Sequence, residues 1–514
     1  MYNRTIDDCL VCCVDNFPDK IAITDMDCEY TWKEVDYIVD VLAQKILGMG
    51  IKAGDHIAIW ASNSASYILY FMAIQRVGGV AVLINMAYKW RELESILKNY
   101  DVNYILYTRK YKDSDHENTI NMLDRDKFKE LRGTCIFDDE RDNLKDLLKI
   151  PKKKIETNVH SEDVACIFFT SGTTGMAKGV MLTHNNLVNN SKDIIERMTW
   201  DERDRMCLAV PLFHCFGITV GILGAIHTGM TMDVARKFST GTVFRIIEEK
   251  RCTLFNGVPT MFLAMMNSSK REQFDLTSLK GGLMAGSSIL PYEYMDICNT
   301  FGFKNLQTAF GQTESSPAIT TSLITDSVEC KAYSAGKKLD NVEVRIVKDG
   351  IVCGVYDEGE IQTRGYHVMR GYYNMPEETK KAIDENGWLS TGDLGYLDKD
   401  GYLHVTGRIK DIIVRGGENI SPMEIENVIV QFDEIKSVKV VGVPAKVIQE
   451  EVVACIVWKD DRRLSKETII SSVKKQLADY KAPKYIFDFE KFPQNSTGKV
   501  LVKDLVRMCE EKLL

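Results

Sequence analysis

The sequence is short of long apolar runs and of basic charge. Its longest apolar region, VGGVAVLINMA from Val77, falls short of the roughly 20 residues that a membrane-spanning helix needs. We therefore expect no integral membrane segment. The 65 lysines and arginines are outnumbered by 73 aspartates and glutamates, which gives a net charge of −8. A nucleic-acid partner would favour a basic surface, so none is expected.

Cysteine is present without the spacing of a disulfide framework or a zinc site. The 14 cysteines are mostly scattered singly, and Cys9, Cys12 and Cys13 have no second pair that would complete a zinc set. The N-terminal segment is too acidic, and its apolar run too short, for a signal peptide. We therefore expect free thiols in a reducing compartment and a cytoplasmic protein.

Strand-like and helix-like segments alternate through most of the 514 residues, a length that suggests about three folding units. DHIAIWA from Asp55 predicts a buried strand, SYILYFMAIQRVG a helix and VAVLIN a second strand. This alternation predicts an α/β fold with a largely parallel sheet. Two charged stretches, from Arg109 and from Lys149, are expected to be surface loops.

The pattern changes after about residue 335. Short alternating segments with glycine turns, such as VEVRIVKDG and GYLHVTG, predict a smaller β-rich part. Beyond Arg408 we expect a strand, a glycine turn and a helix that begins at Ser421-Pro422. The remaining residues are enough for an independent α+β domain.

One segment, TSGTTGMAKG from Thr170, is rich in small and hydroxyl-bearing residues. It lies between a predicted strand and a predicted helix, where a glycine-rich turn exposes N–H groups and hydroxyls to a phosphate chain. Lys178 adds a cation. The P-loop motif is absent because Gly179 follows the lysine, and G-x-G-x-x-G is absent too. The segment alone leaves open which phosphate it binds, and a plain surface turn is the alternative.

Five further segments follow in order along the chain: PLFHCFG from Pro211, MAGSSILP from Met284, AFGQTESSP from Ala309, STGDLGYLDKDGYLHVTGRIKDIIVRGGEN from Ser390 and PQNSTGKVL from Pro493. Together with the phosphate loop they resemble the adenylate-forming superfamily over nearly the whole chain. The similarity looks closest to the medium- and long-chain fatty acyl-CoA synthetases and their aryl-acid relatives. It implies a large N-terminal α/β domain of several subdomains over residues 1–409, which binds ATP and the acid. A small, mobile α+β domain would cover residues 410–514.

The resemblance also implies the reaction. A carboxylate attacks the α-phosphorus of ATP and releases pyrophosphate, and the thiol of coenzyme A then displaces AMP from the acyl adenylate. ATP, Mg²⁺ and coenzyme A are the expected cofactors. A fatty acid is the first choice and an aryl acid the second, because HCFG lacks the aspartate that would hold an amino group. A separate acyl carrier protein as acceptor, a non-catalytic nucleotide-binding relative and a homodimer remain alternatives.

The resemblance assigns the nucleotide-binding residues. The β- and γ-phosphates are expected to contact Thr170, Ser171, Gly172, Thr173, Thr174, Gly175 and Lys178. Mg²⁺ would bind Thr174 and Glu314, and Thr313 would contact the α-phosphate. The adenine would lie against Phe310, Gly311, Gly286, Ser287 and Ser288. Asp393 would accept hydrogen bonds from the ribose hydroxyls, and Arg408 would add a ribose or phosphate contact. Two departures from the family are Ala177, where proline is common, and Phe310, where tyrosine is frequent.

The remaining assignments concern the acid and the thiol. Lys499 is expected to bridge the α-phosphate and the acyl carboxylate. Lys410 matches a hinge, about which the C-terminal domain turns so that Gly416, Gly417 and Glu418 line the thiol channel. His214 would lie beside the carboxylate, with a structural core histidine as the alternative.

Three glycines share one face of a predicted helix, at residues 217, 221 and 224. They would either leave a channel for an aliphatic tail or let a neighbouring helix pack closely.

Overall fold

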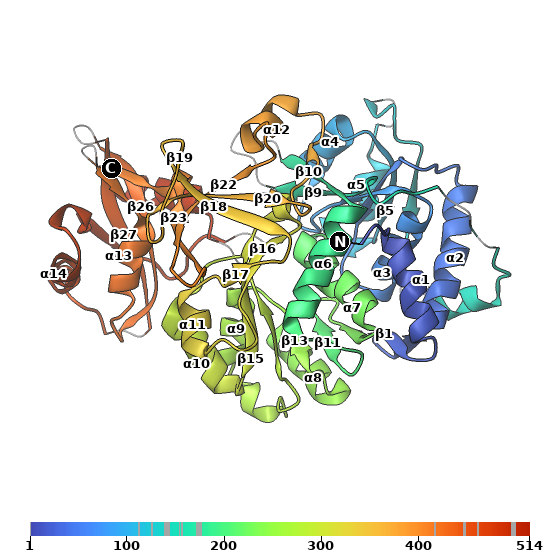
Figure 1. The fold of residues 1–514 in the computed structure, drawn as a ribbon, viewed down its shortest axis with the longest axis horizontal. Coiled ribbons are helices and arrows are strands. Elements are labelled where there is room, and N and C mark those ends of the chain that lie inside the picture. The colour runs from blue at the N-terminus through green and yellow to red at the C-terminus, as the bar shows by residue number, and fades with distance from the viewer. Residues whose placement is uncertain are drawn as a thin grey trace. The chain divides into compact units, whose positions relative to one another are not determined.

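The computed structural model describes residues 2–111, 114–124, 127–137, 144–153, 155, 158–170, 177–415, 418–445, 449–459, 462–494 and 500–513. Figure 1 shows the order of the elements along the chain. The chain divides into two compact units. The larger comprises Met1–Val344 and Thr363–Leu389, and the smaller comprises Arg345–Gln362 and Ser390–Leu514.

A seven-stranded sheet in the larger unit has the strand order β21-β10-β9-β4-β3-β5-β8. Its strands are β3 (His56–Trp60), β4 (Val80–Leu83), β5 (Val102–Tyr107), β8 (Gly133–Ile136), β9 (Val164–Thr170), β10 (Lys178–Thr183) and β21 (Gly371–Tyr372). The five strands from β9 to β8 are parallel, whereas β10 and β21 are antiparallel at one edge. The parallel strands are almost continuously apolar because helices cover the sheet.

A nine-stranded sheet completes the larger unit, in the order β17-β16-β15-β14-β13-β11-β12-β1-β2. Its strands are β1 (Ile21–Asp25), β2 (Cys28–Thr31), β11 (Arg205–Leu208), β12 (Thr231–Val234), β13 (Leu254–Phe255), β14 (Gly281–Met284), β15 (Asn305–Gly311), β16 (Ala318–Thr321) and β17 (Lys337–Lys338). The strands from β15 to β1 are parallel. Loops that follow these strands therefore meet at one edge of the sheet.

Helices connect and cover the two sheets. In chain order they are α1 (Ile6–Asn16), α2 (Trp32–Gly48), α3 (Ala65–Arg76), α4 (Trp90–Asn99), α5 (His116–Asn121), α6 (His184–Met198), α7 (Leu223–Thr228), α8 (Thr240–Lys250), α9 (Pro259–Met266), α10 (Pro291–Phe301), α11 (Val328–Tyr333) and α12 (Pro376–Ala382). A π-helical turn, Gly217–Ile222, leads into α7. A short antiparallel pair, β6 (Lys110–Tyr111) and β7 (Ser114–Asp115), precedes α5.

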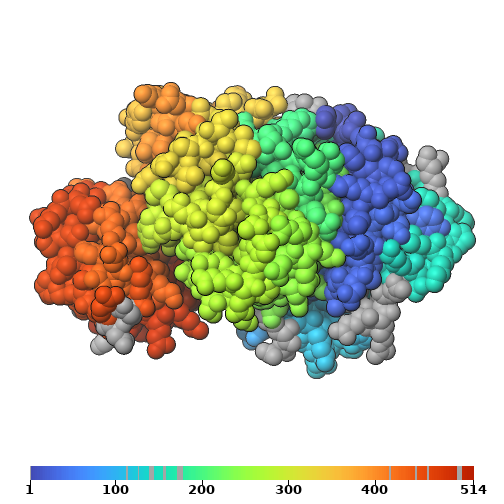
Figure 2. All heavy atoms as spheres, turned by 90° about the horizontal axis from the view of Figure 1, so that it is seen from below, coloured from blue at the N-terminus to red at the C-terminus, as the bar shows by residue number. Residues whose placement is uncertain are grey.

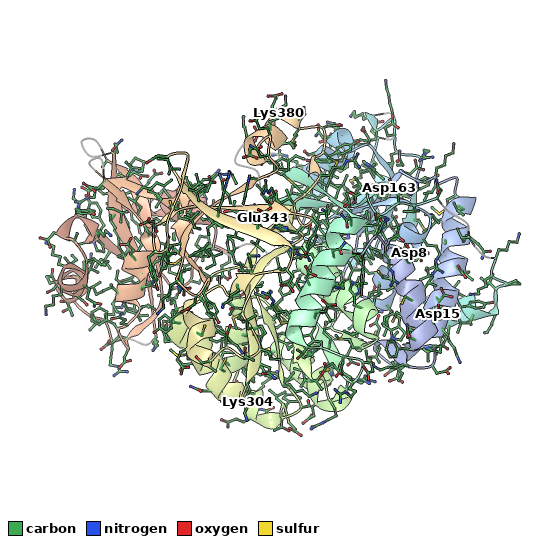
Figure 3. All side chains as sticks on the ribbon, in the orientation of Figure 1. Asp8, Asp15, Asp163, Lys304, Glu343 and Lys380 are labelled. Atoms are coloured by element: carbon green, nitrogen blue, oxygen red, sulfur yellow. The ribbon has the colours of Figure 1, made fainter. Side chains whose placement is uncertain are left out.

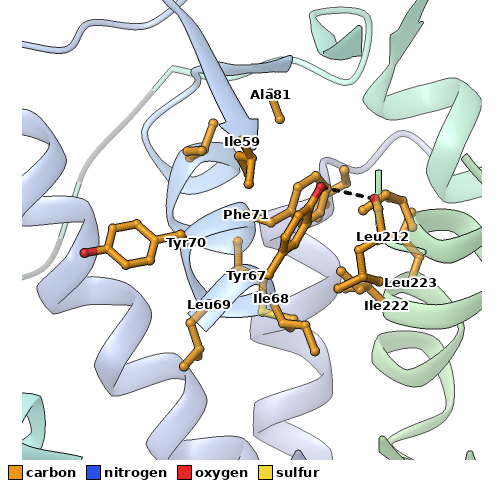
Figure 4. Packing of buried hydrophobic residues seen from close by; sticks show 14 of the residues in the cluster. Ile59, Tyr67, Ile68, Leu69, Tyr70, Phe71, Ala81, Leu212, Ile222 and Leu223 are labelled. Atoms are coloured by element: carbon orange, nitrogen blue, oxygen red, sulfur yellow. Dashed lines mark hydrogen bonds between the residues drawn. The ribbon is translucent and has the colours of Figure 1, made fainter. Parts of the chain in front are cut away.

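The core lies between the sheets. Helix α3 is buried along its whole length, and Tyr67, Ile68 and Phe71 pack against Ile222 and Leu223 (Figure 4). The Tyr67 hydroxyl donates a hydrogen bond to the Leu212 carbonyl at 3.2 Å. This bond anchors the start of the segment that carries His214.

The N-terminal segment packs on the middle of the chain, and Figure 2 shows its residues directly against those of α6 and α7. Lys20 Nζ and the Trp32 indole both donate to the carbonyl of Gly229, at 2.8 and 3.2 Å. A hydroxyl caps α6: Thr183 accepts a hydrogen bond from the Asn186 amide, as helix N-termini require.

The smaller unit contains two sheets. One, in the order β19-β18-β20-β22-β23, is built from β18 (Val342–Lys348), β19 (Ile351–Val352), β20 (Gly359–Gly365), β22 (Leu389–Leu397) and β23 (Leu403–Arg408). The other is built from β24 (Ile413–Arg415), β25 (Glu418–Ile420), β26 (Ile435–Ala445), β27 (Gln449–Trp458) and β28 (Tyr485–Asp488). Its helices are α13 (Pro422–Ile429), α14 (Lys466–Gln476) and α15 (Val502–Leu513). The predicted boundary at 409/410 falls between these two sheets and stays a prediction.

Most predicted elements are confirmed, including β3, α3, β4 and the helix that begins after Ser421. A strand between the phosphate loop and α6 was not expected. Residues 178–183 form β10, whose register pairs Lys178 with Thr170 on β9. The loop therefore joins two antiparallel strands rather than a strand and a helix.

The prediction of a surface loop from Arg109 is wrong in part. Helix α5 lies there, and its His116 is completely buried, with its ring stacked on Trp60 at 3.6 Å between centroids. The prediction rested on the charged residues around His116, and a charge count does not reveal that the ring of this one residue is buried.

All 14 cysteines are free thiols. Within the described ranges, no helix combines the length and apolar character that crossing a bilayer takes.

Candidate active site

Three of the predicted segments gather at the carboxyl edge of the nine-stranded sheet. Parallel strands β11, β14 and β15 end there, and the segments from Pro211, Met284 and Ala309 lie at or just after their ends. Backbone hydrogen bonds link β14 and its loop to the loop after β13: Gly257 donates to Leu283 at 3.1 Å, and Ala285 donates to Gly257 at 3.2 Å. The Asn256 side chain also accepts from the Leu283 amide, at 2.8 Å. The sheet thus brings together residues that lie about a hundred positions apart in sequence.

The predicted adenine strip follows β14. Gly286, Ser287 and Ser288 are exposed, and Gly286 has φ +93°, a conformation that glycine adopts without strain. Phe310 and Gly311 are half-buried at the end of β15. A side chain at Gly311 would collide with the carbonyl of Pro317, so this position admits only glycine. These residues form an open backbone surface beside a phenyl ring.

Glu314 and Thr313 lie in a single 3₁₀ turn, Thr313–Ser315, directly after β15. Ser315 fixes the turn because its hydroxyl donates to the Gln312 carbonyl and accepts from the Gln312 amide. The Glu314 carbonyl accepts from the Met369 amide at 2.9 Å. Its carboxylate Oε1 accepts from the Tyr372 hydroxyl at 2.9 Å. Burial and the negative charge of Glu314 raise the pKa of Tyr372 above its usual range, so the phenol keeps its proton.

Lys178 begins β10 and meets two residues of the segment 372–378. Its Nζ lies 2.5 Å from Oε2 of Glu378, on helix α12, and 4.7 Å from the centre of the Tyr372 ring. Lys380, on the same helix, is labelled in Figure 3. Hydrogen bonds from Lys178 and Lys381 lower the pKa of Glu378 to about 2, so its carboxylate is ionised at neutral pH.

Sequence reasoning missed Tyr372 and Glu378. In the segment RGYYNMPEE, from Arg370, three features could have indicated a functional role: the glycine, the two adjacent tyrosines and the proline at the start of a helix. Nothing in the spacing connects Glu378 with Lys178, because the two residues are 200 positions apart. The antiparallel pairing of β21 with β10 joins them.

His214 follows β11, and both of its predicted roles, a contact with the acid and a structural position in the core, stay predictions. Its Nε2 atom is buried and has no hydrogen-bond partner within the described residues. Burial lowers the pKa of His214 to about 4, so its ring is neutral at physiological pH. Phe213 lies against the ring, with centroids 4.4 Å apart. A neutral imidazole with an unused nitrogen is able to orient a polar group that enters the site.

The three glycines at 217, 221 and 224 lie in close packing. An added Cβ at Gly217 would collide with the Pro211 carbonyl. At Gly221 it would lie 2.7 Å from Leu208, and at Gly224 3.0 Å from Ile195 of α6. At Gly224 the neighbour is another helix, as the close-packing interpretation predicted, whereas at Gly217 and Gly221 it is the loop after β11 and strand β11 itself.

Asp393 and Arg408 pair within the smaller unit. They are cross-strand partners on β22 and β23, and Arg408 Nε donates to Asp393 Oδ1 at 2.5 Å. Asp393 is buried while Arg408 is exposed, so the arginine holds one carboxylate oxygen in a fixed orientation. Lys410, in the turn Ile409–Asp411, and Glu418, at the start of β25, are both exposed.

Thr170 is the last residue of β9. Other predicted residues lie outside the described residues, and their assignments stay predictions: Ser171, Gly172, Thr173, Thr174, Gly175, Gly416, Gly417 and Lys499.

Two family models match the chain. Residues 13–373 match the AMP-binding enzyme model, and residues 424–499 match that of the AMP-binding enzyme C-terminal domain. The chain belongs to the AMP-binding enzyme family. These are the adenylate-forming enzymes that the sequence motifs resemble.

Curated relatives match this chain over nearly its whole length and are named as acyl-CoA synthetases or ligases. A putative acyl-CoA synthetase, YngI, of Bacillus subtilis (strain 168) is 36% identical over 97% of this chain and 96% of the relative. The mitochondrial medium-chain acyl-CoA ligase ACSF2 of Danio rerio is 31% identical over 100% of this chain and 89% of its own.

Solved structures confirm the fold. ATP-bound MatB from Rhodopseudomonas palustris superposes with a TM-score of 0.90 at 25% identity, covering 100% of both chains. The o-succinylbenzoate CoA synthetase MenE of Bacillus subtilis, solved with its acyl-adenylate intermediate, gives 0.83 at 28% identity over 98% of each chain. The predicted α/β fold, with a large N-terminal and a smaller C-terminal domain, is confirmed. The chain is an ATP-dependent acid–CoA ligase that works through an acyl adenylate.

Proposed function

We propose that the acid is a fatty acid and that Mg²⁺ accompanies ATP. The arrangement of Glu314, Tyr372 and Lys178 carries the Mg²⁺–ATP part of the proposal, since it places a carboxylate and a cation beside one buried phenol. The relatives named acyl-CoA synthetase and medium-chain acyl-CoA ligase support an aliphatic acid. MenE is named for o-succinylbenzoate, an acid that carries an aryl ring, which keeps an aryl acid as the second candidate.

The residues at the site fit Mg²⁺. Glu314 offers carboxylate oxygens, which this hard cation prefers. Thr174, the other residue assigned to the ion, lies outside the described residues. Among the described residues, no group of three or more His, Cys, Asp or Glu side chains could hold a metal ion. The ion would use the Glu314 carboxylate and complete its shell with phosphate oxygens and water, its usual arrangement with nucleotides. Bound there, Mg²⁺ would neutralise negative charge on the phosphates during attack.

The chain's own residues act by position and charge. Lys178 meets the β- and γ-phosphates together with the loop of residues 170–175, and Thr313 contacts the α-phosphate. Lys499 bridges the α-phosphate and the carboxylate, which reduces their repulsion as they meet.

The acid and the ribose meet other side chains. Neutral His214 directs its unpaired Nε2 to the acid, and surrounding apolar residues disfavour a charged α-ammonium. Asp393 holds the ribose hydroxyls, with Arg408 beside it.

The second half-reaction uses the C-terminal region. We assign the hinge to Lys410 and the thiol channel to Gly416, Gly417 and Glu418. The exposed position of Lys410 within a short turn between two sheets supports a hinge there.

The free cysteines support the cytoplasm as the working compartment, because reducing conditions keep thiols unpaired. A homodimer, which the sequence left open, is tested by sedimentation and would appear at twice the mass of one chain.

Pyrophosphate release tests the function. We would measure it with ATP and Mg²⁺ across straight-chain acids from C4 to C18 and a set of benzoates, with and without coenzyme A. We expect release to peak at one chain length and a thioester to form only with coenzyme A. A peak among the benzoates would establish the aryl candidate instead. Release without any thioester would contradict coenzyme A as acceptor and indicate a carrier protein.

A further inference from the structure

We propose that Tyr372 is a positioning residue that fixes Glu314 and Lys178 in one arrangement, so that ATP binding depends on Mg²⁺. The inference rests on the proposed roles of Glu314 and Lys178. It adds a residue that neither the motif order nor the family models assign.

The backbone of Tyr372 is held on both sides. On β10, Gly179 accepts a hydrogen bond from the Tyr373 amide at 2.8 Å, and Met181 accepts from the Arg370 amide at 3.0 Å. On α12, the Thr379 hydroxyl accepts from the Tyr372 amide at 2.9 Å. Tyr372 itself is 9% exposed. A side chain on a backbone anchored in this way has little freedom to move. The Tyr372 side chain therefore determines the positions of Glu314 and Lys178.

The side chain contacts opposite charges with different parts. Its hydroxyl donates to Glu314 Oε1 at 2.9 Å, and a hydrogen bond to a charged acceptor is among the stronger ones. Its ring face lies 4.7 Å from the Lys178 ammonium, within the range of a cation–π interaction. The hydroxyl therefore fixes the orientation of the Glu314 carboxylate, and the ring fixes the position of the Lys178 ammonium.

The two contacts are separable by substitution. Tyr372→Phe removes the hydroxyl and keeps the ring, whereas Tyr372→Leu removes both. Since Glu314 acts on ATP through the metal, loss of the hydroxyl should weaken ATP binding only when Mg²⁺ is present. A substitution that merely loosened the fold would weaken binding with and without the metal.

The experiment is calorimetric titration of ATP into the full chain, in Mg²⁺ and in EDTA. For Tyr372→Phe we expect affinity in Mg²⁺ to fall about tenfold, as for a lost hydrogen bond to a charged group. In EDTA it should change less than about twofold. For Tyr372→Leu a further loss of about two- to fivefold should appear under both conditions.

Tyr373→Phe is the matched control. The hydroxyl of Tyr373 donates to Asp101 at 2.7 Å, and this residue directly follows Tyr372, the last residue of β21. This variant should bind ATP as the wild type does, in Mg²⁺ and in EDTA.

A second route begins from the partner carboxylate rather than from the tyrosine. Glu314→Asp shortens the half-buried carboxylate by one methylene and takes it out of reach of the phenol. We expect the same loss in Mg²⁺, and Tyr372→Phe should add less than about twofold in this background. Independent, additive losses would overturn the proposal, as would equal losses in Mg²⁺ and EDTA.

These outcomes are distinct from failure of the proposed function. If no acid supports pyrophosphate release, the ATP titrations still decide the role of Tyr372. If the wild type binds no ATP at all, both proposals fall.

Discussion

Two charged clusters in the larger unit are built in opposite ways. Arg76 on α3 is 5% exposed, and its guanidinium contacts Asp7 of α1 and Asp36 and Asp40 of α2, each at 2.8 Å. At the carboxyl edge of the nine-stranded sheet, the Glu314 carboxylate receives one hydrogen bond within the described residues. Lys178 pairs there with one carboxylate, that of Glu378.

The difference separates structural charge from functional charge. Three carboxylates use the hydrogen-bonding capacity of Arg76, so this cluster joins three helices and has nothing left for a ligand. Lys178 and Glu314 each keep capacity for a further partner. A saturated cluster maximises stability, whereas a partly satisfied one keeps its charges available for phosphate and metal.

Breaking the saturated cluster should have the largest effect. Arg76→Met leaves Asp7 without its cation and leaves Asp36 and Asp40 with Lys152 alone. We expect the free energy of unfolding to fall by about 3–5 kcal/mol. Urea denaturation at pH 7 measures this. Arg203→Met is the control, because its pair with Asp201 is exposed and should matter by less than about 0.5 kcal/mol. Equal losses in both variants would contradict the comparison.

Removing Lys499, the lysine that we propose for adenylation, should reduce the rate and leave stability unchanged. For Lys499→Ala we expect pyrophosphate release to slow by about 10²–10³-fold, the usual cost of a lost transition-state charge. The melting temperature should match the wild type. Lys503→Ala, on an exposed position of α15, should keep full activity. A slow Lys503→Ala variant would mean that the whole terminal segment matters, rather than one cation.

Acid should weaken the fold through its buried histidines. Burial lowers the pKa of five of the eight to about 4: His116, His184, His214, His227 and His367. The unfolded chain takes up these protons near pH 6.5, the folded chain only near 4. Stability should therefore fall between these values, by up to about 1.4 kcal/mol per pH unit for each group.

His184 offers a single-site version of this test. Its Nδ1 accepts a hydrogen bond from the Ile6 amide at 3.1 Å, which ties α1 to α6. His184→Asn should be less stable at pH 7, yet its stability should fall less steeply from pH 6.5 to 4. Urea denaturation across this range measures the slope. His160→Asn, an exposed position, should keep the wild-type slope, and a flat wild-type profile would refute the argument.

The smallest effect is expected at Glu378. Glu378→Gln removes the anion that Lys178 must leave when phosphate arrives, so the KM for ATP should fall by up to about fivefold. The pair is partly exposed, which limits its strength. Steady-state kinetics at several salt concentrations measures this, because added salt should reduce the difference between variant and wild type. A rise in KM would show that Glu378 orients Lys178 for ATP.

The sequence predicted the elements of the fold more fully than the contacts within the site. The apolar pattern of β3, α3 and β4 was sufficient to predict these elements, because each is almost wholly apolar. The motif order assigned roles to Glu314, Asp393 and Lys178, and these roles stay predictions.

Partners across the fold were out of reach. Tyr372 and Glu378 act on residues 58 and 200 positions away, and strand pairing alone brings them there. Strand β10 was missed because its six residues directly follow a glycine-rich loop and directly precede a capped helix. The glycines at 217, 221 and 224 allowed two interpretations until their neighbours were known.

The route of the chain has a consequence for synthesis on the ribosome. The chain passes between the compact units after Val344, Gln362 and Leu389, and strands β18, β20 and β22 span these passages. When residue 365 has been made, β18, β19 and β20 exist without β22 and β23, and so few strands are marginally stable in water. Maturation of the smaller unit must therefore wait for translation beyond Arg408. A shortened messenger that stops before this point would release a chain with an unpaired strand edge, a natural target for chaperones and proteases.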